Sequence, residues 1–159
     1  MVEMDEGAPA VTPTLMGRWQ TRIFSVLVVG LIWTLVLTPF LPSTTTAPGG
    51  SRIANLYLLT LTALGIIVVL GVVLWEPLYH LLQQFRWEKD WPPIFILIEA
   101  IPEAIVLHWV IGHLITSTAL GWPAFLIDFS TTWLVIFAFI HGPMRVPFMR
   151  WRFRGGRIL

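Results

Sequence analysis

The chain has 159 residues, of which 56% are hydrophobic and only 12% are charged, whereas soluble domains usually carry about 25% charged residues. The formal net charge of +1 provides no basic field that would attract nucleic acid. Cysteine is absent, which excludes disulfides and thiolate metal sites within this chain. This composition predicts an all-α integral membrane protein rather than a soluble domain.

Two long apolar runs follow an acidic start. Residues 1–17 contain Glu and Asp among small polar residues, and we expect them to form an acidic tail without structure of its own. Residues 23–41 and 54–76 are rich in Leu, Val and Ile and are long enough to cross a membrane. The Gly, Pro and Thr residues between these runs predict a loop. The first half of the chain therefore predicts two transmembrane helices.

The second half begins with a change of pattern. In residues 78–91, apolar side chains recur at helical spacing between charged ones, which predicts a short amphipathic helix in the membrane interface. Residues 93–118 and 123–141 predict two further spans, and the short turn between them predicts an antiparallel hairpin. We therefore expect a transmembrane domain over residues 18–145 with four transmembrane helices and an interfacial helix between helices 2 and 3.

The basic residues predict how this domain is oriented. Arg52 alone falls on one side of the four-span arrangement. The other nine fall on the opposite side: Arg18, Arg22, Arg86, Lys89, Arg145, Arg150, Arg152, Arg154 and Arg157. By the positive-inside rule, both termini are cytoplasmic. The localisation that we expect is the cytoplasmic membrane of a bacterium.

The C-terminal tail, residues 146–159, alternates basic and aromatic residues. Such alternation can bind single-stranded nucleic acid, but directly after a span it favours the anionic headgroups of lipids. The side chains expected to bind headgroups are Arg150, Arg152, Arg154 and Arg157.

Ionisable residues at membrane depth each cost about 2.5 kcal/mol or more, so each needs a reason. Glu103, His113 and Asp128 are candidates for a proton or cation site, or for polar contacts between helices. The predicted hairpin places residue 113 roughly opposite Asp128, which predicts a His113–Asp128 hydrogen bond. Glu103 has no evident partner in the chain. Because Pro102 leaves the carbonyl of Ile98 without its helical donor, a protonated Glu103 could donate to it.

Cofactor chemistry has weaker support. Glu76, His80, Glu99 and Glu103 are candidate ligands for iron, manganese or zinc near the cytoplasmic side, although the Glu-x-x-His pairs of di-iron bundles are missing. A tetrapyrrole is a further alternative, since His80 and His141 approach one depth on two helices. Bound lipids are the ligands that we expect. The sequence has no Gly-x-Ser-x-Gly, Walker or dinucleotide motif, which predicts no catalytic activity of its own.

These features favour an accessory or structural subunit of a larger membrane protein complex. Such a subunit braces its neighbours and anchors at the cytoplasmic interface, and its partners are other membrane subunits and anionic lipids. Ala100 and Ala104 form a small-xxx-small pair that permits close helix approach. The alternative is a small transporter or a proton- or cation-conducting protein, acting as a homo-oligomer, that uses the intramembrane Glu, His and Asp residues.

Overall fold

The computed structural model describes residues 13–42, 51–85, 93–114, 121–148 and 157–158. Within these ranges every regular element is a helix, and four helices are long and apolar enough to cross a membrane. The prediction of an all-α chain with four candidate transmembrane helices is therefore confirmed. Most of the predicted acidic tail and residues 86–91 of the predicted interfacial helix lie outside the described residues.

The first span is a helix of 26 residues, Leu15–Phe40, whose winding changes along its length. Thr14 caps its start, because the Thr14 hydroxyl accepts a hydrogen bond from the Gly17 amide at 3.1 Å. The helix thus begins at Leu15 rather than at residue 23, so Arg22 belongs to the helix and not to its flank. Its segments are α1 (Leu15–Phe24), the π-helical η1 (Ser25–Gly30), α2 (Leu31–Leu37) and the 3₁₀ turn η2 (Thr38–Phe40).

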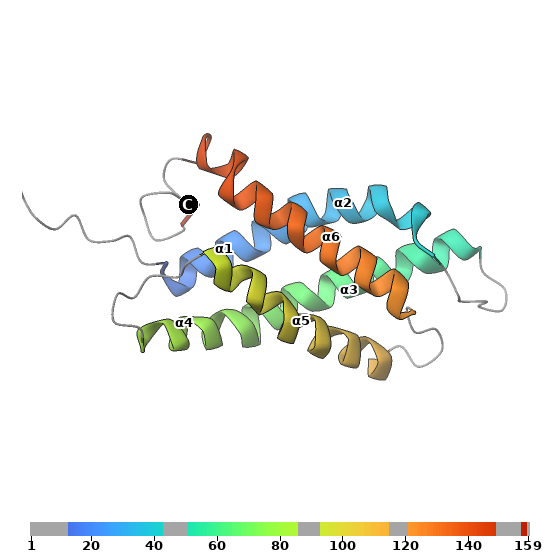
Figure 1. The fold of residues 1–159 in the computed structure, drawn as a ribbon, viewed down its shortest axis with the longest axis horizontal. Coiled ribbons are helices and arrows are strands. Elements are labelled where there is room, and N and C mark those ends of the chain that lie inside the picture. The colour runs from blue at the N-terminus through green and yellow to red at the C-terminus, as the bar shows by residue number, and fades with distance from the viewer. Residues whose placement is uncertain (1–12, 43–50, 86–92, 115–120, 149–156, 159) are drawn as a thin grey trace, which may run out of the picture.

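The second span is a helix of 33 residues, Arg52–Gln84. At 1.5 Å per residue it is about 50 Å long, which exceeds the roughly 30 Å of a hydrocarbon core. The sequence suggested that this span ends at residue 76 and that a separate helix follows over 78–91. Instead, the segment after residue 76 continues the same helix (Figure 1). The parts of this helix are α3 (Arg52–Leu70), the π-helical η3 (Gly71–Trp75) and α4 (Glu76–Gln84).

The third and fourth spans are α5 (Pro93–Leu114) and α6 (Trp122–His141), and the 3₁₀ turn η4 (Pro143–Arg145) follows α6. Proline opens both helices, at a position where its missing N–H costs nothing. Pro102 lies inside α5 without ending it. The two helices are tied together by the Trp133 indole, whose Nε1–H donates to the carbonyl of Ile96 at 2.9 Å.

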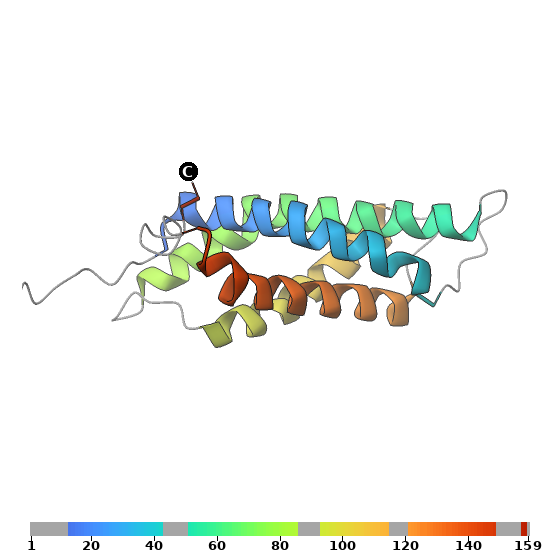
Figure 2. The ribbon, with the colours of Figure 1, turned by 90° about the horizontal axis from the view of Figure 1, so that it is seen from above.

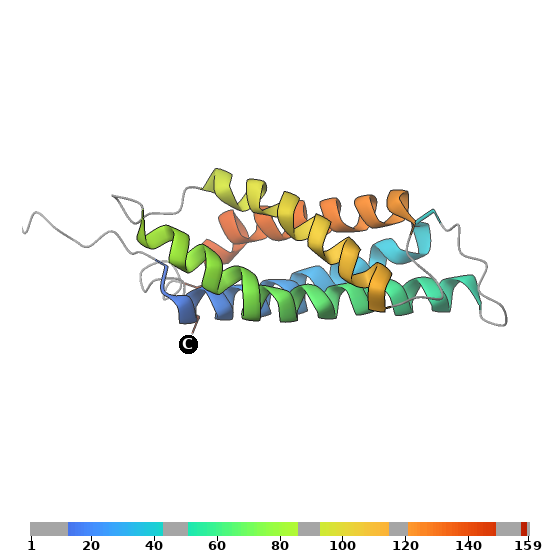
Figure 3. The same cartoon turned by 90° about the horizontal axis from the view of Figure 1, so that it is seen from below.

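The four spans alternate in direction and form a two-layered bundle. The first and second spans lie side by side in one layer, and α5 and α6 form the other (Figures 2 and 3). The first span also contacts α6, and α3 contacts α5, so each span packs mainly against two neighbours. One end of the bundle carries the start of α1 and the end of α4 (Figure 1), and we call it the α1–α4 end.

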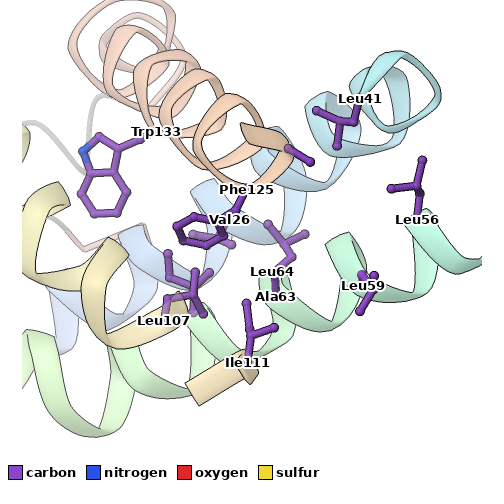
Figure 4. Close-up of a cluster of buried hydrophobic side chains, with 12 residues drawn as sticks. Val26, Leu41, Leu56, Leu59, Ala63, Leu64, Leu107, Ile111, Phe125 and Trp133 are labelled. Carbon is purple, nitrogen blue, oxygen red and sulfur yellow. The ribbon is translucent and has the colours of Figure 1, made fainter. Parts of the chain in front are cut away.

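The apolar core lies along the middle of the bundle, where the layers meet. Phe125 of α6 lies beside Val26 of the first span at the centre of the cluster (Figure 4). Leu64 of α3 and Leu107 of α5 complete the contact from the other two spans. Because residues from all four spans bury one another here, packing at this level fixes the register between the layers.

Gly30 marks the closest approach between the first span and its neighbours. A Cβ at this position would lie 3.3 Å from Ile136, 3.4 Å from Leu64 and 3.5 Å from Thr132. A glycine is therefore needed for the first span to pack this tightly against α3 and α6. One turn further on, the Trp33 indole donates to the Thr131 hydroxyl at 3.0 Å, and this hydrogen bond joins the first span to α6.

Replacing Gly30 with leucine should lower the free energy of unfolding by about 1–3 kcal/mol, since the new side chain must displace packed neighbours. Thermal unfolding of the purified protein in mild detergent would measure the loss. Gly65 provides the control, because a Cβ there would meet nothing within 4 Å. Gly65→Leu should leave the midpoint unchanged or raise it. Equal losses in the two variants would contradict the close crossing at Gly30.

Candidate functional site

Arg22 joins three of the four spans through its guanidinium group. Its side chain is 8% exposed. Nη2 donates to Glu103 Oε1 of α5 at 2.5 Å, and Nε lies 3.2 Å from Glu76 Oε1 of α4. One buried cation is thus shared by two carboxylates, and the whole group carries a formal charge of −1.

Glu103 is fully buried, with 0% of its surface exposed. The expectation that Glu103 has no partner in the chain is wrong, because Arg22 pairs with it. The error arose from counting Arg22 as a charge in front of the first span. Since the first helix begins at Leu15, Arg22 lies within the helix and its side chain points into the bundle.

A second arginine extends this network along α4. Arg18, one turn before Arg22, lies 3.5 Å from Glu76 Oε2 through Nη1 and donates through Nη2 to Gln83 Oε1 at 3.0 Å. Tyr79 interacts electrostatically with Glu103, and its ring stacks on Trp75 with centroids 5.7 Å apart. The charged and polar side chains of α1 and α4 therefore face each other near the α1–α4 end.

Gly71 provides the space that Arg22 occupies. A Cβ at Gly71 would lie 2.5 Å from Arg22 Nε and 3.2 Å from its Cγ and Cδ. Gly71 opens the π-helical segment η3, and the other π-helical segment, η1, begins shortly after Arg22. Such segments are rare in proteins and occur frequently at functional sites. Both π-helical segments therefore lie close to the buried arginine.

An aromatic wall runs along α6 toward the same arginine. Phe125, Phe129 and Trp133 follow one another at i, i+4 spacing, with ring centroids 5.7 and 5.5 Å apart. The Arg22 guanidinium carbon lies 5.4 Å from the centre of the Trp133 ring. At this distance the ring face attracts the cation, so the guanidinium is held by carboxylates and by an aromatic ring.

A cavity of about 490 Å³ lies between the two layers and is lined by residues of all four spans. Arg18, Glu99 and Arg145 line it near the α1–α4 end. Further along the bundle the lining becomes apolar and includes the aromatic wall. Toward the opposite end it reaches Asp128 and Thr34. The cavity therefore connects a charged end of the bundle with a buried carboxylate.

Asp128 is 8% exposed and has no charged partner in the part of the chain that the structure describes. Its Oδ1 lacks a hydrogen bond there, as do the buried hydroxyls of Thr34 and Thr132. All three side chains line the cavity. Asp128 was a predicted site residue, whereas nothing in the sequence distinguished these two threonines from the others in the spans.

His113 does not form the predicted hydrogen bond with Asp128 among the described residues. Its ring is exposed, and its Nδ1 lies 2.8 Å from the carbonyl oxygen of Trp109 on its own helix. Asp128 instead faces the cavity. The two residues were placed opposite each other by counting from the turn, but rotation of α5 about its axis directs His113 outward. Glu103, His113 and Asp128 are therefore not gathered into one site.

The candidate metal ligands are not gathered into one site either. Glu76 and Glu103 share Arg22, Glu99 lines the cavity, and His80 contacts Gln84 at 3.4 Å. Within the described ranges, no group of three or more His, Cys, Asp or Glu side chains could hold a metal ion. Two of the three candidate carboxylates, Glu76 and Glu103, form ion pairs with Arg22.

The predicted headgroup-binding tail is only partly described. Arg150, Arg152 and Arg154 lie outside the described residues. Arg157 lies inside them, and its Nε donates to the Thr14 hydroxyl at 3.3 Å. The amide of Ile158 donates to Gln20 Oε1 at 2.7 Å. The end of the chain therefore docks on the first helical turns of α1.

Arg22 was missed because its partners are distant in sequence, although one signal was present. Arg18 and Arg22 repeat at i, i+4 on one helix face, which is the spacing of Glu99 and Glu103 on α5. Matching basic and acidic pairs on two spans could have suggested an intramembrane ion pair. No comparable signal existed for Gly71, since its role depends on which helix lies opposite.

Replacing Arg22 with methionine should lower the free energy of unfolding by about 3–5 kcal/mol, because it leaves Glu103 buried and uncompensated. The double variant Arg22→Met, Glu103→Met should recover most of that loss, since a buried ion pair exchanged for apolar residues is often nearly neutral. Unfolding midpoints in mild detergent would measure both effects.

Arg52 provides the matched control for these variants. It is exposed, and its Nη2 donates to the Leu41 carbonyl at 3.2 Å, away from the Arg22 network, so Arg52→Met should lower the stability by no more than about 0.5–1.5 kcal/mol. If the double variant were no more stable than Arg22→Met, the pairing of Arg22 with Glu103 would not be the reason for the loss.

No protein-family model, curated protein or solved structure matched this chain in comparisons of sequence and fold. The function must therefore be argued from the geometry itself. The structure offers three features from which a function can be inferred: the Arg22 network, the cavity, and Asp128, which has no charged partner among the described residues.

Proposed function

We propose that the chain is a small transporter or a proton- or cation-conducting membrane protein, and that Asp128 lies on the route of the ion. The observation that carries this proposal is the cavity of about 490 Å³ that reaches a buried carboxylate without a partner in the described chain. Pockets of about 300–1,000 Å³ are typical of small-ligand sites. A cavity of this kind distinguishes the bundle from one that only braces its neighbours.

The energetics of buried charge separate Asp128 from the other acids. A carboxylate at membrane depth costs about 2.5–3.5 kcal/mol and in most cases either pairs or marks a substrate or ion pathway. Glu103 and Glu76 pair with Arg22, which accounts for both as structural contacts. Asp128 has no ion pair of this kind among the described residues. Its position on a cavity wall supports a functional reason for keeping it.

The lining of the cavity supports access from the α1–α4 end. Arg18, Glu99 and Arg145 provide charges of both signs there, where a hydrated ion can exchange its water for polar side chains. Beyond Asp128, the Trp122 ring stacks on His108 with centroids 3.6 Å apart. Stacked rings at this point suggest a closed outer side, so passage would need α5 and α6 to move apart there.

The orientation that we propose follows from the basic residues. Both termini are cytoplasmic, and the α1–α4 end faces the cytoplasm of a bacterial cell. The excess length of the second span then places α4 at the inner membrane interface, where its amphipathic pattern suits headgroup contact. The basic C-terminal tail follows the fourth span in the sequence, so on this orientation we expect it to bind anionic lipids of the cytoplasmic leaflet.

A role as an accessory subunit is the second candidate, and the outer face of α5 supports it. α5 is the least buried span, with 17% of its most apolar window buried against 28–39% for the others. Trp109 is 61% exposed, and His113 beside it is exposed as well. An ionisable side chain on an outward face is better accommodated by a neighbouring protein than by lipid. Extraction in gentle detergent followed by identification of co-purifying subunits tests this role.

Liposomes containing the purified protein should conduct protons or monovalent cations under an imposed potential, whereas protein-free liposomes should not. Asp128→Asn should reduce the flux at least about 10-fold, which corresponds to 1.4 kcal/mol. A pH-sensitive dye inside the liposomes would measure proton flux, and a sodium-sensitive dye would measure the flux of a monovalent cation. Ser130→Ala is the control, because this exposed hydroxyl lies on α6 and outside the cavity. A flux that survives Asp128→Asn would remove Asp128 from the route.

Single cysteines test the orientation directly, because the natural sequence contains none. In intact cells, a membrane-impermeant maleimide should label Ser51→Cys, which precedes the second span. Gln84→Cys, at the other end of that span, should react only after the membrane is permeabilised. The reverse pattern would place the α1–α4 end outside the cell, contrary to the positive-inside rule.

A further inference from the structure

We infer that Asp128, Thr132 and Thr34 form a binding site for one monovalent alkali cation. The site deepens the function proposed above by naming the ion and its ligands, and it rests on that function only for the role of the bound ion. Thr34 is 1%, Asp128 8% and Thr132 9% exposed. Each has a buried side-chain oxygen without a hydrogen-bond partner among the described residues, and all three residues line the cavity.

The packing of the first span on α6 brings these three side chains within one helical turn of each other. The two helices run antiparallel, and a Cβ on Gly30 would lie 3.5 Å from the Thr132 side chain. From Gly30 the first span reaches Thr34 one turn later, and from Thr132 α6 reaches Asp128 one turn in the same direction. The Trp33–Thr131 hydrogen bond holds this register. The Asp128 carboxylate therefore lies at the level of Thr34 on the opposite span, and the Thr132 hydroxyl lies one turn away on the same helix as Asp128.

These two threonines differ from the other hydroxyl residues of the bundle. A hydroxyl in an apolar helix ordinarily donates to a carbonyl one turn earlier on its own helix. Four others in the spans do so, at 2.5–3.0 Å: Thr38 to Thr34, Thr60 to Leu56, Ser130 to Leu126 and Thr131 to Ile127. Thr34 and Thr132 instead leave their oxygens on the cavity. The lone pairs of these hydroxyl oxygens are therefore available to an electron-pair acceptor such as a cation.

The charge of the site selects a monovalent cation. A single carboxylate carries one negative charge, and the bundle's buried arginine, Arg22, is already engaged by two other carboxylates. A monovalent ion leaves the site neutral, whereas a divalent ion would leave a positive charge in a low-dielectric interior. Oxygen ligands alone favour hard cations over transition metals. Water in the cavity can complete the coordination shell.

A proton is the main rival, because it also neutralises Asp128. A proton joins only oxygens that lie within hydrogen-bond distance of each other, and Asp128 forms no hydrogen bond with either threonine hydroxyl in the described chain. A cation placed between the oxygens can bind ones that are further apart. An alkali cation can be bound by all three side chains at once, so it accounts for both threonines as well as for the carboxylate.

The test is the thermal stability of the full-length protein in detergent at constant pH. Sodium, potassium or lithium chloride would replace choline chloride at constant ionic strength. At least one alkali cation should raise the unfolding midpoint in a saturable way, as expected for a ligand that binds the folded state. Isothermal titration calorimetry with the same chloride, measured against choline chloride, should give the same half-saturating concentration.

Three variants assign the ligands. Asp128→Asn should abolish the response to alkali cations. Thr34→Val and Thr132→Val, which remove one oxygen each at nearly unchanged volume, should raise the half-saturating concentration at least about 10-fold. Thr131→Val is the matched control, because the Thr131 hydroxyl donates to Ile127 and accepts from Trp33. It should lower stability without changing the half-saturating concentration.

A midpoint that is the same in choline and in all three alkali chlorides would overturn the inference. So would a response that survives Asp128→Asn, or one that the two valine variants leave unchanged. The assay needs no flux, so the inference and the proposed function can fail separately. Cation binding without flux would refute only the proposed function, and flux without saturable alkali binding would refute only this site.

Discussion

The Arg22 guanidinium is the contact on which the arrangement of the bundle depends. It is shared by Glu76 and Glu103, so three spans meet at a single cation. In a hydrocarbon environment apolar side chains gain little by leaving lipid for protein, and helix association relies on packing and polar contacts. A charged contact between three spans also specifies a register, because a shift of one turn would leave an uncompensated carboxylate in the interior.

The backbone next to this contact leaves room for it. A side chain at residue 71 would collide with the Arg22 side chain, and glycine avoids that collision. The two π-helical segments are adjacent to the network and widen the helix locally, which changes the direction of the side chains that follow. The Trp133 ring covers the guanidinium from α6. The fourth span thus joins the network through an aromatic face, without a charge of its own at that level.

The helices were predictable from sequence because the signals for them are local. Apolar runs, proline positions and capping residues such as Ser51 define each span independently of the others. The first two spans were predicted too short at the α1–α4 end, since Arg22 and Glu76 were assigned to the membrane boundary. Pairing between spans was not predicted: the matching i, i+4 spacing of Arg18 with Arg22 and of Glu99 with Glu103 pointed to it, but rotation about each helix axis decides which side chains meet. Glu103 therefore gained a partner that the sequence did not reveal, and His113 lost the one that was expected.

The contrast between paired and unpaired charges is what connects the fold to a function. The Arg22–Glu103 ion pair gives each of two buried charges a partner of opposite sign and joins the first span to α5. Asp128 lies in the same bundle, buried to nearly the same degree, but faces a cavity instead of a cation. Glu76 and Glu103 each have an arginine beside them, and an arginine could equally have been placed beside Asp128. Under the proposed function, Asp128 and two hydroxyls without hydrogen-bond partners among the described residues remain available to an ion that arrives from outside.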